Sequence, residues 1–211
     1  VAVKGNLLQS IRETGELSPE NTEELKEAID YCHVRGVKAY LTVNTLMFDS
    51  ELSKALGLIT DAYNKGIDAV IVQDFGLASL IRKHLPDLRL HGSTQMSVHT
   101  PSGAKALYEM GFSRVVLSRE LTLKEIEEIR KACPIELEVF VHGALCMSVS
   151  GQCLLSAFLG SRSGNRGLCA GPCRLPFKAK NGTGYDLSLK DLSLVDYIRE
   201  MAEMGVCSFK I

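Results

Sequence analysis

Short apolar runs alternate along the chain with amphipathic stretches whose apolar residues recur at helical spacing. The apolar runs are rich in β-branched residues, and glycines follow several of the amphipathic stretches. The apolar runs predict strands over residues 37–45, 68–74, 88–96, 113–118, 135–143, 185–191 and 206–211. The amphipathic stretches predict helices over residues 18–35, 50–65, 77–84, 101–110, 123–133 and 194–204, with Ser18 as the first N-cap.

The predicted strands are mostly apolar on both faces, which is typical of a parallel sheet covered by helices. Most strand starts lie one βα unit apart, so we predict an α/β fold of the (β/α)8 TIM-barrel type. No strand is predicted before the first helix, and the barrel is therefore expected to be truncated, with its first strand missing. An open doubly wound sheet is the alternative. We expect residues 1–211 to form a single barrel-like catalytic domain with a Cys-rich insertion over residues 144–182.

Charge is distributed unevenly, although the whole chain has a net charge of only -1. Residues 142–180 contain no Asp or Glu but carry five Lys and Arg residues, so the rest of the chain is net acidic. This asymmetry predicts that an anion meets residues 142–180. The anion could be nucleic acid, phosphate or an anionic cluster. Three arginines of this segment are candidate phosphate contacts, and a solvated basic loop is the alternative: Arg162, Arg166 and Arg174.

Four of the seven cysteines lie in the same segment, at the spacing C-x6-C-x15-C-x3-C: Cys146, Cys153, Cys169 and Cys173. The odd number of cysteines and the lack of a visible signal peptide favour reduced thiols in the cytoplasm over disulfides. Structural zinc prefers closely paired cysteines, and only the last two approach that spacing. Iron–sulfur clusters are held by four thiolates on irregular loops, and glycines throughout the segment permit such a loop. Unliganded cysteines or a single cysteine nucleophile stay open as alternatives.

Polar residues stand at the carboxyl ends of the predicted strands, where barrel enzymes place their chemistry. They are Asn44, Asp74, Gln95, Arg119, His142 and Lys190. His142 is a candidate acid/base group, and Gln95 is a candidate reader of a base edge. Glu138 has the same inward parity as His142, so we expect its carboxylate to pair with His142 or Lys190. A purely structural role is the alternative for each. No run of 18 apolar residues is present, so no membrane span is expected.

The stretch ELEVFVHGALCMSVSGQCLLS (136–156) resembles the signature of the collagenase-like peptidases of unknown catalytic type (peptidase class U, number 32). The stretches NRGLCAGPCR and LSLKDLSLVDYI after it, and ELKEAIDYCHVRGVKAYLTVNTL and HGSTQMSVHT before it, are similar to motifs of the same family. The resemblance covers essentially the whole chain. It implies a barrel-like catalytic domain, and it implies a chain clipped at both ends.

Some members of this family resemble oxygen-independent hydroxylases that act on transfer RNA, ribosomal RNA or ubiquinone precursors. The resemblance implies a 4Fe-4S cluster held by Cys146, Cys153, Cys169 and Cys173. We therefore expect an iron–sulfur-dependent hydroxylase of a base in tRNA or rRNA, for which a small-molecule hydroxyl donor would be a second partner. The expected catalytic residues are Gln95, Glu138, His142 and Lys190, and the expected substrate contacts are Asn44, Arg162, Arg166 and Arg174. A peptidase with a cysteine or metal mechanism is the alternative, although the sequence has neither G-x-S-x-G nor H-E-x-x-H. A non-catalytic iron–sulfur subunit is the third possibility.

Overall fold

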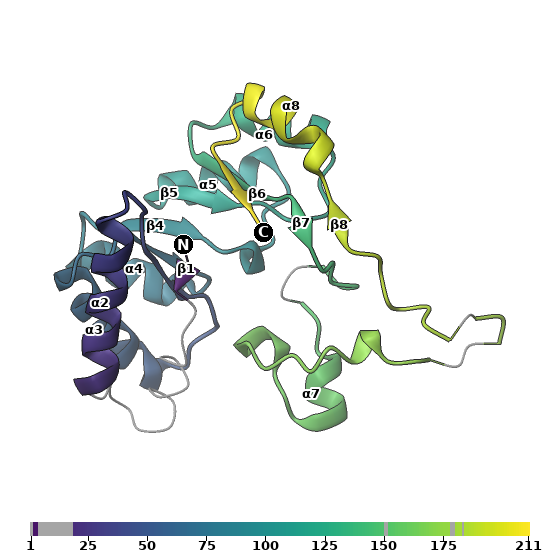
Figure 1. Cartoon of the computed structure of the whole chain (residues 1–211), viewed down its shortest axis with the longest axis horizontal. Helices are drawn as coiled ribbons and strands as arrows, with labels where there is room; N and C mark the ends of the chain where they lie inside the picture. The colour runs from purple at the N-terminus through teal and green to yellow at the C-terminus, as the bar shows by residue number, and fades with distance from the viewer. Residues whose placement is uncertain (1, 4–18, 150–151, 178–179, 183) are drawn as a thin grey trace. The chain divides into compact units, whose positions relative to one another are not determined.

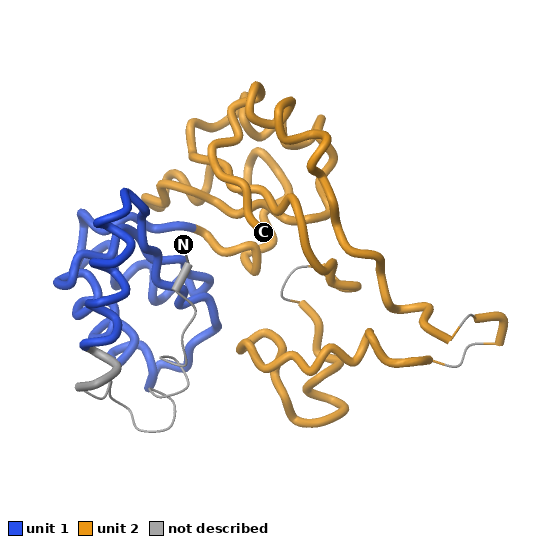
Figure 2. The backbone as a smooth tube through the Cα atoms, in the orientation of Figure 1, with its two compact units in different colours: residues 1–91 blue, residues 92–211 orange. Residues whose placement is uncertain are grey.

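The computed structural model of the chain describes residues 2–3, 19–149, 152–177, 180–182 and 184–211 (Figure 1). The predicted N-cap Ser18 lies outside these residues. The chain divides into two compact units, residues 1–91 and residues 92–211 (Figure 2). Across the described residues, the helices are all too short or too polar to cross a membrane.

Strands and helices alternate through the first unit. They are β1 (Ala2–Val3), α2 (Pro19–His33), β2 (Tyr40–Val43), α3 (Asp49–Asn64), β3 (Ala69–Val72), α4 (Phe75–His84) and β4 (Arg89–Gly92), which reaches the boundary. The strand order is β1-β2-β3-β4, and the pairings of β1 with β2 and of β2 with β3 are parallel. All four residues of β3 are buried, as the apolar run of its sequence predicts for a central strand.

The second unit begins with a similar alternation and then changes character. Its elements are η1 (Thr94–Met96), α5 (Pro101–Glu109), β5 (Phe112–Val116), α6 (Leu123–Ala132), β6 (Glu136–Phe140), β7 (His142–Gly143), α7 (Leu155–Gly160), η2 (Gly164–Arg166), η3 (Pro172–Arg174), β8 (Leu192–Ser193), η4 (Val195–Tyr197), α8 (Ile198–Glu203) and β9 (Ser208–Lys210). Residues 144–191 contain only short helical turns and α7 among the positions that the structure describes.

The sheet of the second unit joins strands that are far apart in sequence. Its order is β5-β6-β9, and both pairings are parallel, with Glu138 opposite Ser208 and Phe140 opposite Lys210. The residues between β6 and β9 therefore leave the sheet and return to it. Near the point of departure, β7 and β8 pair antiparallel and bring His142 opposite Ser193. The cysteine segment thus extends from a two-stranded stem.

The core of the second unit lies on one face of this sheet. Leu137 and Val139 alternate along β6 and are buried, while α6 buries Ile126 and Ile129, which lie three residues apart on one helical face. Met201 of α8 is also fully buried. The other face of β6 carries Glu136, Glu138 and Phe140 and is the polar face of the sheet.

The prediction of a parallel α/β fold is confirmed. In neither unit does the strand order reverse, as it would in a doubly wound sheet. Two predicted details are wrong. A strand does precede the first helix, since Ala2 and Val3 pair with Tyr40 and Leu41. Residues 185–191 form no strand, because their alternating apolar residues find no neighbouring strand, and the short strand β8 begins after them.

Candidate functional site

The sulfurs of two clustered cysteines accept hydrogen bonds from the backbone. The N–H of Leu155 points to Cys153 Sγ at 3.4 Å, and the N–H of Gly171 points to Cys169 Sγ at 3.3 Å. In both cases the donor lies two residues after the cysteine. Amide donors of this kind also surround the sulfurs of iron–sulfur clusters, where hydrogen bonds to sulfur tune the cluster.

Ser156 holds the loop of Cys169 against the start of α7. Its side chain is buried, its hydroxyl lies 3.7 Å from Cys169 Sγ, and it accepts the N–H of Ala170 at 3.0 Å. Gly164 lies in the same place, where an added Cβ would meet Cys169 Cβ at 3.4 Å and the Cys153 carbonyl at 3.6 Å. Cys153 and Cys169 are therefore neighbours, although fifteen residues separate them in the sequence.

Arg174 links the first and last cysteines of the segment through their chain neighbours. Its guanidinium donates to the carbonyl of Leu145 at 3.1 Å and to the hydroxyl of Ser188 at 3.1 Å, and it also bonds the carbonyl of Leu189. Cys146 follows Leu145 and Cys173 precedes Arg174, so this side chain ties those two positions together. In the structure the Arg174 guanidinium makes its hydrogen bonds within the chain. Binding of RNA phosphate by Arg174 stays a prediction.

The four thiols do not form a complete metal site by themselves. Among the described residues, no three His, Cys, Asp or Glu side chains gather closely enough to hold a metal ion. All seven cysteines are free thiols. The chemical groups nevertheless fit an iron–sulfur cluster, because the segment offers four thiols as ligands and backbone N–H donors to two of the sulfurs.

Glu138 is the centre of an ion-pair network on the polar face of the β5-β6-β9 sheet. Its carboxylate lies 3.2 Å from Lys210 Nζ and 3.2 Å from an Arg114 amino group, and it accepts the Ser208 hydroxyl at 3.0 Å. Arg114 also binds Glu136 through two nitrogens, at 2.9 and 2.8 Å. The expected pairing of Glu138 with His142 or Lys190 is wrong, because the parallel neighbours β5 and β9 supply its partners.

The network keeps the Glu138 carboxyl ionised. Burial alone would raise the pKa of this carboxyl, but the charge of Lys210, its hydrogen bond, the Ser208 hydroxyl and the charge of Arg114 outweigh burial. The pKa of Glu138 therefore falls below its ordinary value of 4.5. An ionised carboxylate bound to two cations is better suited to fixing the sheet than to accepting a proton.

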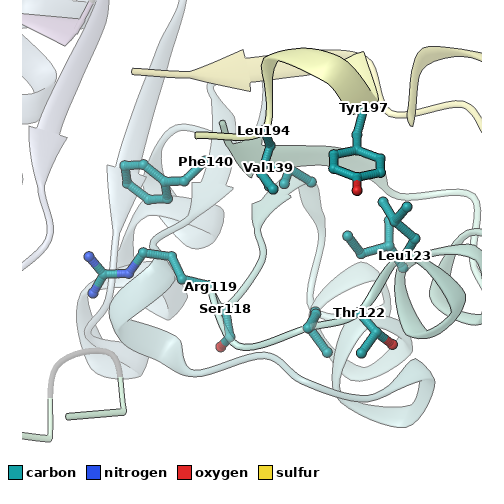
Figure 3. Close-up of a pocket in the computed structure, with 10 residues that line it drawn as sticks. Ser118, Arg119, Thr122, Leu123, Val139, Phe140, Leu194 and Tyr197 are labelled. Carbon is teal, nitrogen blue, oxygen red and sulfur yellow. The ribbon is translucent and has the colours of Figure 1, made fainter. Parts of the chain in front are cut away.

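A pocket of about 310 Å³ opens at the carboxyl ends of β5 and β6 (Figure 3). Its wall is mostly apolar, with Tyr197 and Leu123 on one side and Phe140 and Arg119 on the other (Figure 3). The Arg119 guanidinium lies 5.6 Å from the centre of the Phe140 ring. The hydroxyl of Ser118, which also lines the pocket, is buried and makes no hydrogen bond within the described part of the chain. The pocket can accommodate a small molecule with an apolar body.

The remaining predicted site residues belong to different elements. His142 is exposed in β7, and Lys190 is exposed in irregular chain. Gln95 is half-buried in η1, where its N–H donates to the Ser93 hydroxyl at 3.2 Å. Asn44 follows β2 in the first unit. In the cysteine segment, the exposed Arg162 donates through Nε to the carbonyl of Leu168 at 3.0 Å, and Arg166 ends η2.

The roles of several residues could not be predicted from the sequence. Arg114 and Lys210 pair with Glu138 across strands, and no local pattern indicates that Glu138 pairs with Lys210, seventy-two residues away. Ser156 is one serine among many until its burial is known. Asp74, expected at a strand end, is explained locally: its side chain caps α4 at the N–H of Leu77 and accepts the N–H of Met47.

The chain is similar over most of its length to proteins that modify RNA. It is 41% identical over 196 residues to the 23S rRNA 5-hydroxycytidine synthase of Escherichia coli (strain K12), covering 90% of this chain and 30% of that protein. It is 40% identical over 168 residues to the tRNA hydroxylation protein P of the same organism, covering 79% of this chain and 37% of that protein. The chain thus spans about a third of the length of these two relatives.

The chain is also similar to a protein that is described as a collagenase. The collagenase of Porphyromonas gingivalis (strain ATCC BAA-308 / W83) is 35% identical over 212 residues, which cover 90% of this chain and 50% of that protein. Among solved structures, that of the U32 peptidase Mk0906 superposes with a TM-score of 0.58 at 18% identity, covering 89% of this chain and 74% of that one. This likeness shows a common fold.

The family assignment rests on the sequence itself. The model of peptidase family U32 matches residues 11–211, which include all four clustered cysteines and every strand after β1. The chain belongs to peptidase family U32.

Proposed function

We propose that the chain is part of an iron–sulfur-dependent, oxygen-independent hydroxylase of a base in tRNA or rRNA. The observation that carries the proposal is the cysteine segment, where four thiols lie in an acid-free stretch and two sulfurs accept backbone N–H groups. The identity of about 40% to hydroxylation proteins for both rRNA and tRNA supports an RNA substrate.

The residues that would hold a 4Fe-4S cluster are Cys146, Cys153, Cys169 and Cys173. Such a cluster supplies one-electron transfer or a Lewis-acidic iron when it is bound. The chain's own contribution is to orient the thiolates: the amides of Leu155 and Gly171 donate to the sulfurs, and Arg174 holds the two ends of the segment together. Basic side chains without neighbouring acids in the sequence would offset the negative charge of cluster and RNA.

The pocket at the ends of β5 and β6 is our candidate site for a small-molecule hydroxyl donor. Its volume of about 310 Å³ suits a small organic molecule, and Ser118 and Tyr197 give it hydroxyl groups. Replacing Leu194, which lines the pocket, by Trp would fill it. We expect Leu194→Trp to reduce RNA hydroxylation while the iron content stays unchanged. Unchanged hydroxylation would remove the pocket from the proposal.

The cluster is tested on the intact protein purified without oxygen. We expect iron, labile sulfide and a broad visible absorption, all of which Cys169→Ala should abolish. Cys207→Ala, which changes an exposed cysteine outside the segment, is the matched control and should retain them. A colourless, iron-free protein with intact thiols after reconstitution would contradict the proposal.

The RNA substrate is tested in cells. Deleting the gene should remove one hydroxylated nucleoside from digested total RNA, and the wild-type gene should restore it while the Cys169→Ala gene should not. If every nucleoside persists in the deletion strain, the substrate is not RNA. A cluster without any such change would favour a non-catalytic iron–sulfur subunit.

Peptidase activity is the second candidate, favoured by the similarity to a protein described as a collagenase. It is tested by incubating the intact protein with gelatin or casein. Cleavage that survives replacement of all four clustered cysteines would exclude them as nucleophiles. Cleavage that disappears with Cys153→Ala alone would support a cysteine mechanism.

A further inference from the structure

The helix α7, inside the cysteine segment, exposes large apolar side chains. Phe158 is 83% exposed, Leu159 is 65% exposed and Leu154, at its N-cap, is 58% exposed. Leu154 and Phe158 lie one helical turn apart. Single exposed apolar residues are common on protein surfaces, but a cluster of them marks a surface that meets a partner.

The exposure of Phe158 does not result from a loosely attached loop. The N–H of Ser161 donates to the carbonyl of Ala157 at 2.9 Å, and the N–H of Arg162 donates to that of Ser156 at 3.2 Å. Ser161 adopts the left-handed conformation, with φ of 55°, which few residues other than glycine adopt and which ends the helix sharply. Ser156, in the first turn of α7, is the buried residue of this helix. The aromatic ring is therefore presented by an ordered element.

Positive charge accompanies this apolar surface. Arg162 lies just beyond Ser161, the C-cap of α7, and is exposed, and its Nε donates to the carbonyl of Leu168 at 3.0 Å. Arg166 lies in the next helical turn, η2. Both arginines belong to the stretch from residue 142 to residue 180, which contains five Lys and Arg residues and no Asp or Glu. A protein partner matched to an apolar surface needs no such excess of positive charge, whereas a polyanion does.

We propose that Leu154, Phe158, Leu159 and Arg162, together called the α7 platform, dock an unpaired segment of RNA. Phe158 stacks on a base, and Arg162 and Arg166 contact the phosphates on either side. The combination of an exposed aromatic ring with neighbouring cations is the arrangement by which proteins hold single-stranded nucleic acid. Bases in a duplex are already stacked on each other and leave no face for Phe158.

This inference rests on the proposed function and specifies that the RNA substrate is unpaired where it docks. The platform belongs to the same segment as the four cysteines, so RNA docked there is held by the segment that would carry the cluster. The expected substrate is then a loop or another unpaired region of a folded RNA rather than a continuous helix.

The test measures binding of the intact protein, purified without oxygen, to a fluorescently labelled RNA of twelve nucleotides by anisotropy. We expect the single strand to bind more tightly than the same sequence in a duplex. Phe158→Ala should weaken single-strand binding about tenfold, since each stacked base contributes on that order. Phe158→Tyr should retain most of the affinity, because its ring still stacks.

The matched control is Tyr108→Ala, which removes another exposed aromatic ring, on α5, and should leave RNA binding unchanged. The iron content of Phe158→Ala should equal that of the wild type, which separates docking from cluster assembly. Equal RNA affinity for Phe158→Ala and wild type, or tighter binding of the duplex, would overturn the inference. The inference would also fail if Phe158→Ala changed only the self-association of the protein, measured by sedimentation. The platform would then bind a second copy of the chain.

Failure of the inference and failure of the proposed function give different results. If Phe158→Ala binds RNA normally while the gene deletion still removes a hydroxylated nucleoside, only the platform is wrong. If Phe158→Ala loses RNA binding but no nucleoside depends on the gene, the platform stands and the hydroxylase proposal fails.

Discussion

Glu138 shows at the scale of one residue how a polar group is accommodated on a sheet. Its two carboxylate oxygens contact side chains from both neighbouring strands, namely Arg114 of β5 and Ser208 and Lys210 of β9. The parallel register places Ser208 opposite Glu138, whereas Arg114 and Lys210 lie opposite Glu136 and Phe140 and reach Glu138 from one pair further along the strands. A carboxylate that would be costly to bury alone thus becomes a tie between three strands.

Glu138→Gln should destabilise the protein by about 2–3 kcal/mol at neutral pH, because it leaves two cations beside an uncharged amide. The measurement is the free energy of unfolding in urea. The pKa of Glu138 is lowered in the folded state, so its contribution is fully present above its ordinary pKa of 4.5. It is lost as the pH falls through the lowered pKa, and the difference between wild type and variant should therefore shrink in acid.

Glu136→Gln is the matched control for this change. The Glu136 side chain is 37% exposed, against 7% for Glu138, although both contact Arg114. The exposed residue should contribute less than about 1 kcal/mol. Equal costs for the two variants, or a difference that persists unchanged in acid, would show that Glu138 does not act through its charge.

Ser156 is a second single residue whose removal has a defined consequence. Ser156→Ala deletes both the acceptor for the Ala170 N–H and the hydroxyl beside Cys169 Sγ, and should lower the stability of the segment by about 1 kcal/mol. In the reconstituted protein we expect faster loss of iron to a chelator. Ser163→Ala, a change of the same kind at a half-buried position of the segment, should lose iron at the wild-type rate. Indistinguishable rates for all three proteins would argue against the contact.

Helix α6 illustrates which elements could be predicted from sequence. Thr122 and Glu125 form a capping box, in which the Glu125 carboxylate accepts the Thr122 N–H at 2.7 Å and Thr122 Oγ1 accepts the N–H of Glu125 at 3.4 Å. Its boundaries were predictable to one residue because these signals are local. The strand pairing of β9 with β6 was not, since it depends on contacts between residues about seventy positions apart.

The same distinction explains what was predictable of the candidate site. The cysteine spacing is visible in the sequence, but the hydrogen bond that joins Arg174 to Leu145 forms only in the folded chain. Residues 185–191 are a case in which a local pattern predicted a strand that the structure does not contain. Tyr185, Leu187 and Leu189 alternate as in a strand, yet a strand requires a partner, and alternation carries no information about one.

Thr122→Ala should cost about 1 kcal/mol of stability, because it removes the side chain that caps α6. The measurement is again the urea dependence of unfolding. Ser79→Ala, which removes a hydroxyl from an exposed position within α4, should be neutral or slightly stabilising, since alanine favours helices. A cost for Thr122→Ala no greater than that for Ser79→Ala would mean that the capping box is dispensable.

For the molecule as a whole, charge is separated along the sequence, with an acid-free segment in a chain of net charge -1. Because phosphate contacts release counterions, RNA affinity should fall steeply as salt is added. The slope of the logarithm of affinity against the logarithm of salt concentration should become shallower by about 0.7 in Arg162→Gln, the value for one contact to a single strand.

The control for this prediction is Arg199→Gln, which removes an exposed arginine of α8 outside the segment. Its salt dependence should match that of the wild type. If both variants change the slope equally, the positive charge acts through the whole surface and not through the cysteine segment.

The pairing of β6 with β9 has a consequence for how the protein is made. During synthesis β6 emerges first, and its edge stays unpaired until residues 141–207 have followed and β9 can dock. At about 5–20 residues per second this takes several seconds, during which the unpaired strand edge can pair with other chains. The nascent chain therefore has to finish its entire thiol-bearing segment before the sheet can close. Cells that delay the ribosome within that segment should accumulate an aggregation-prone intermediate in place of the mature protein.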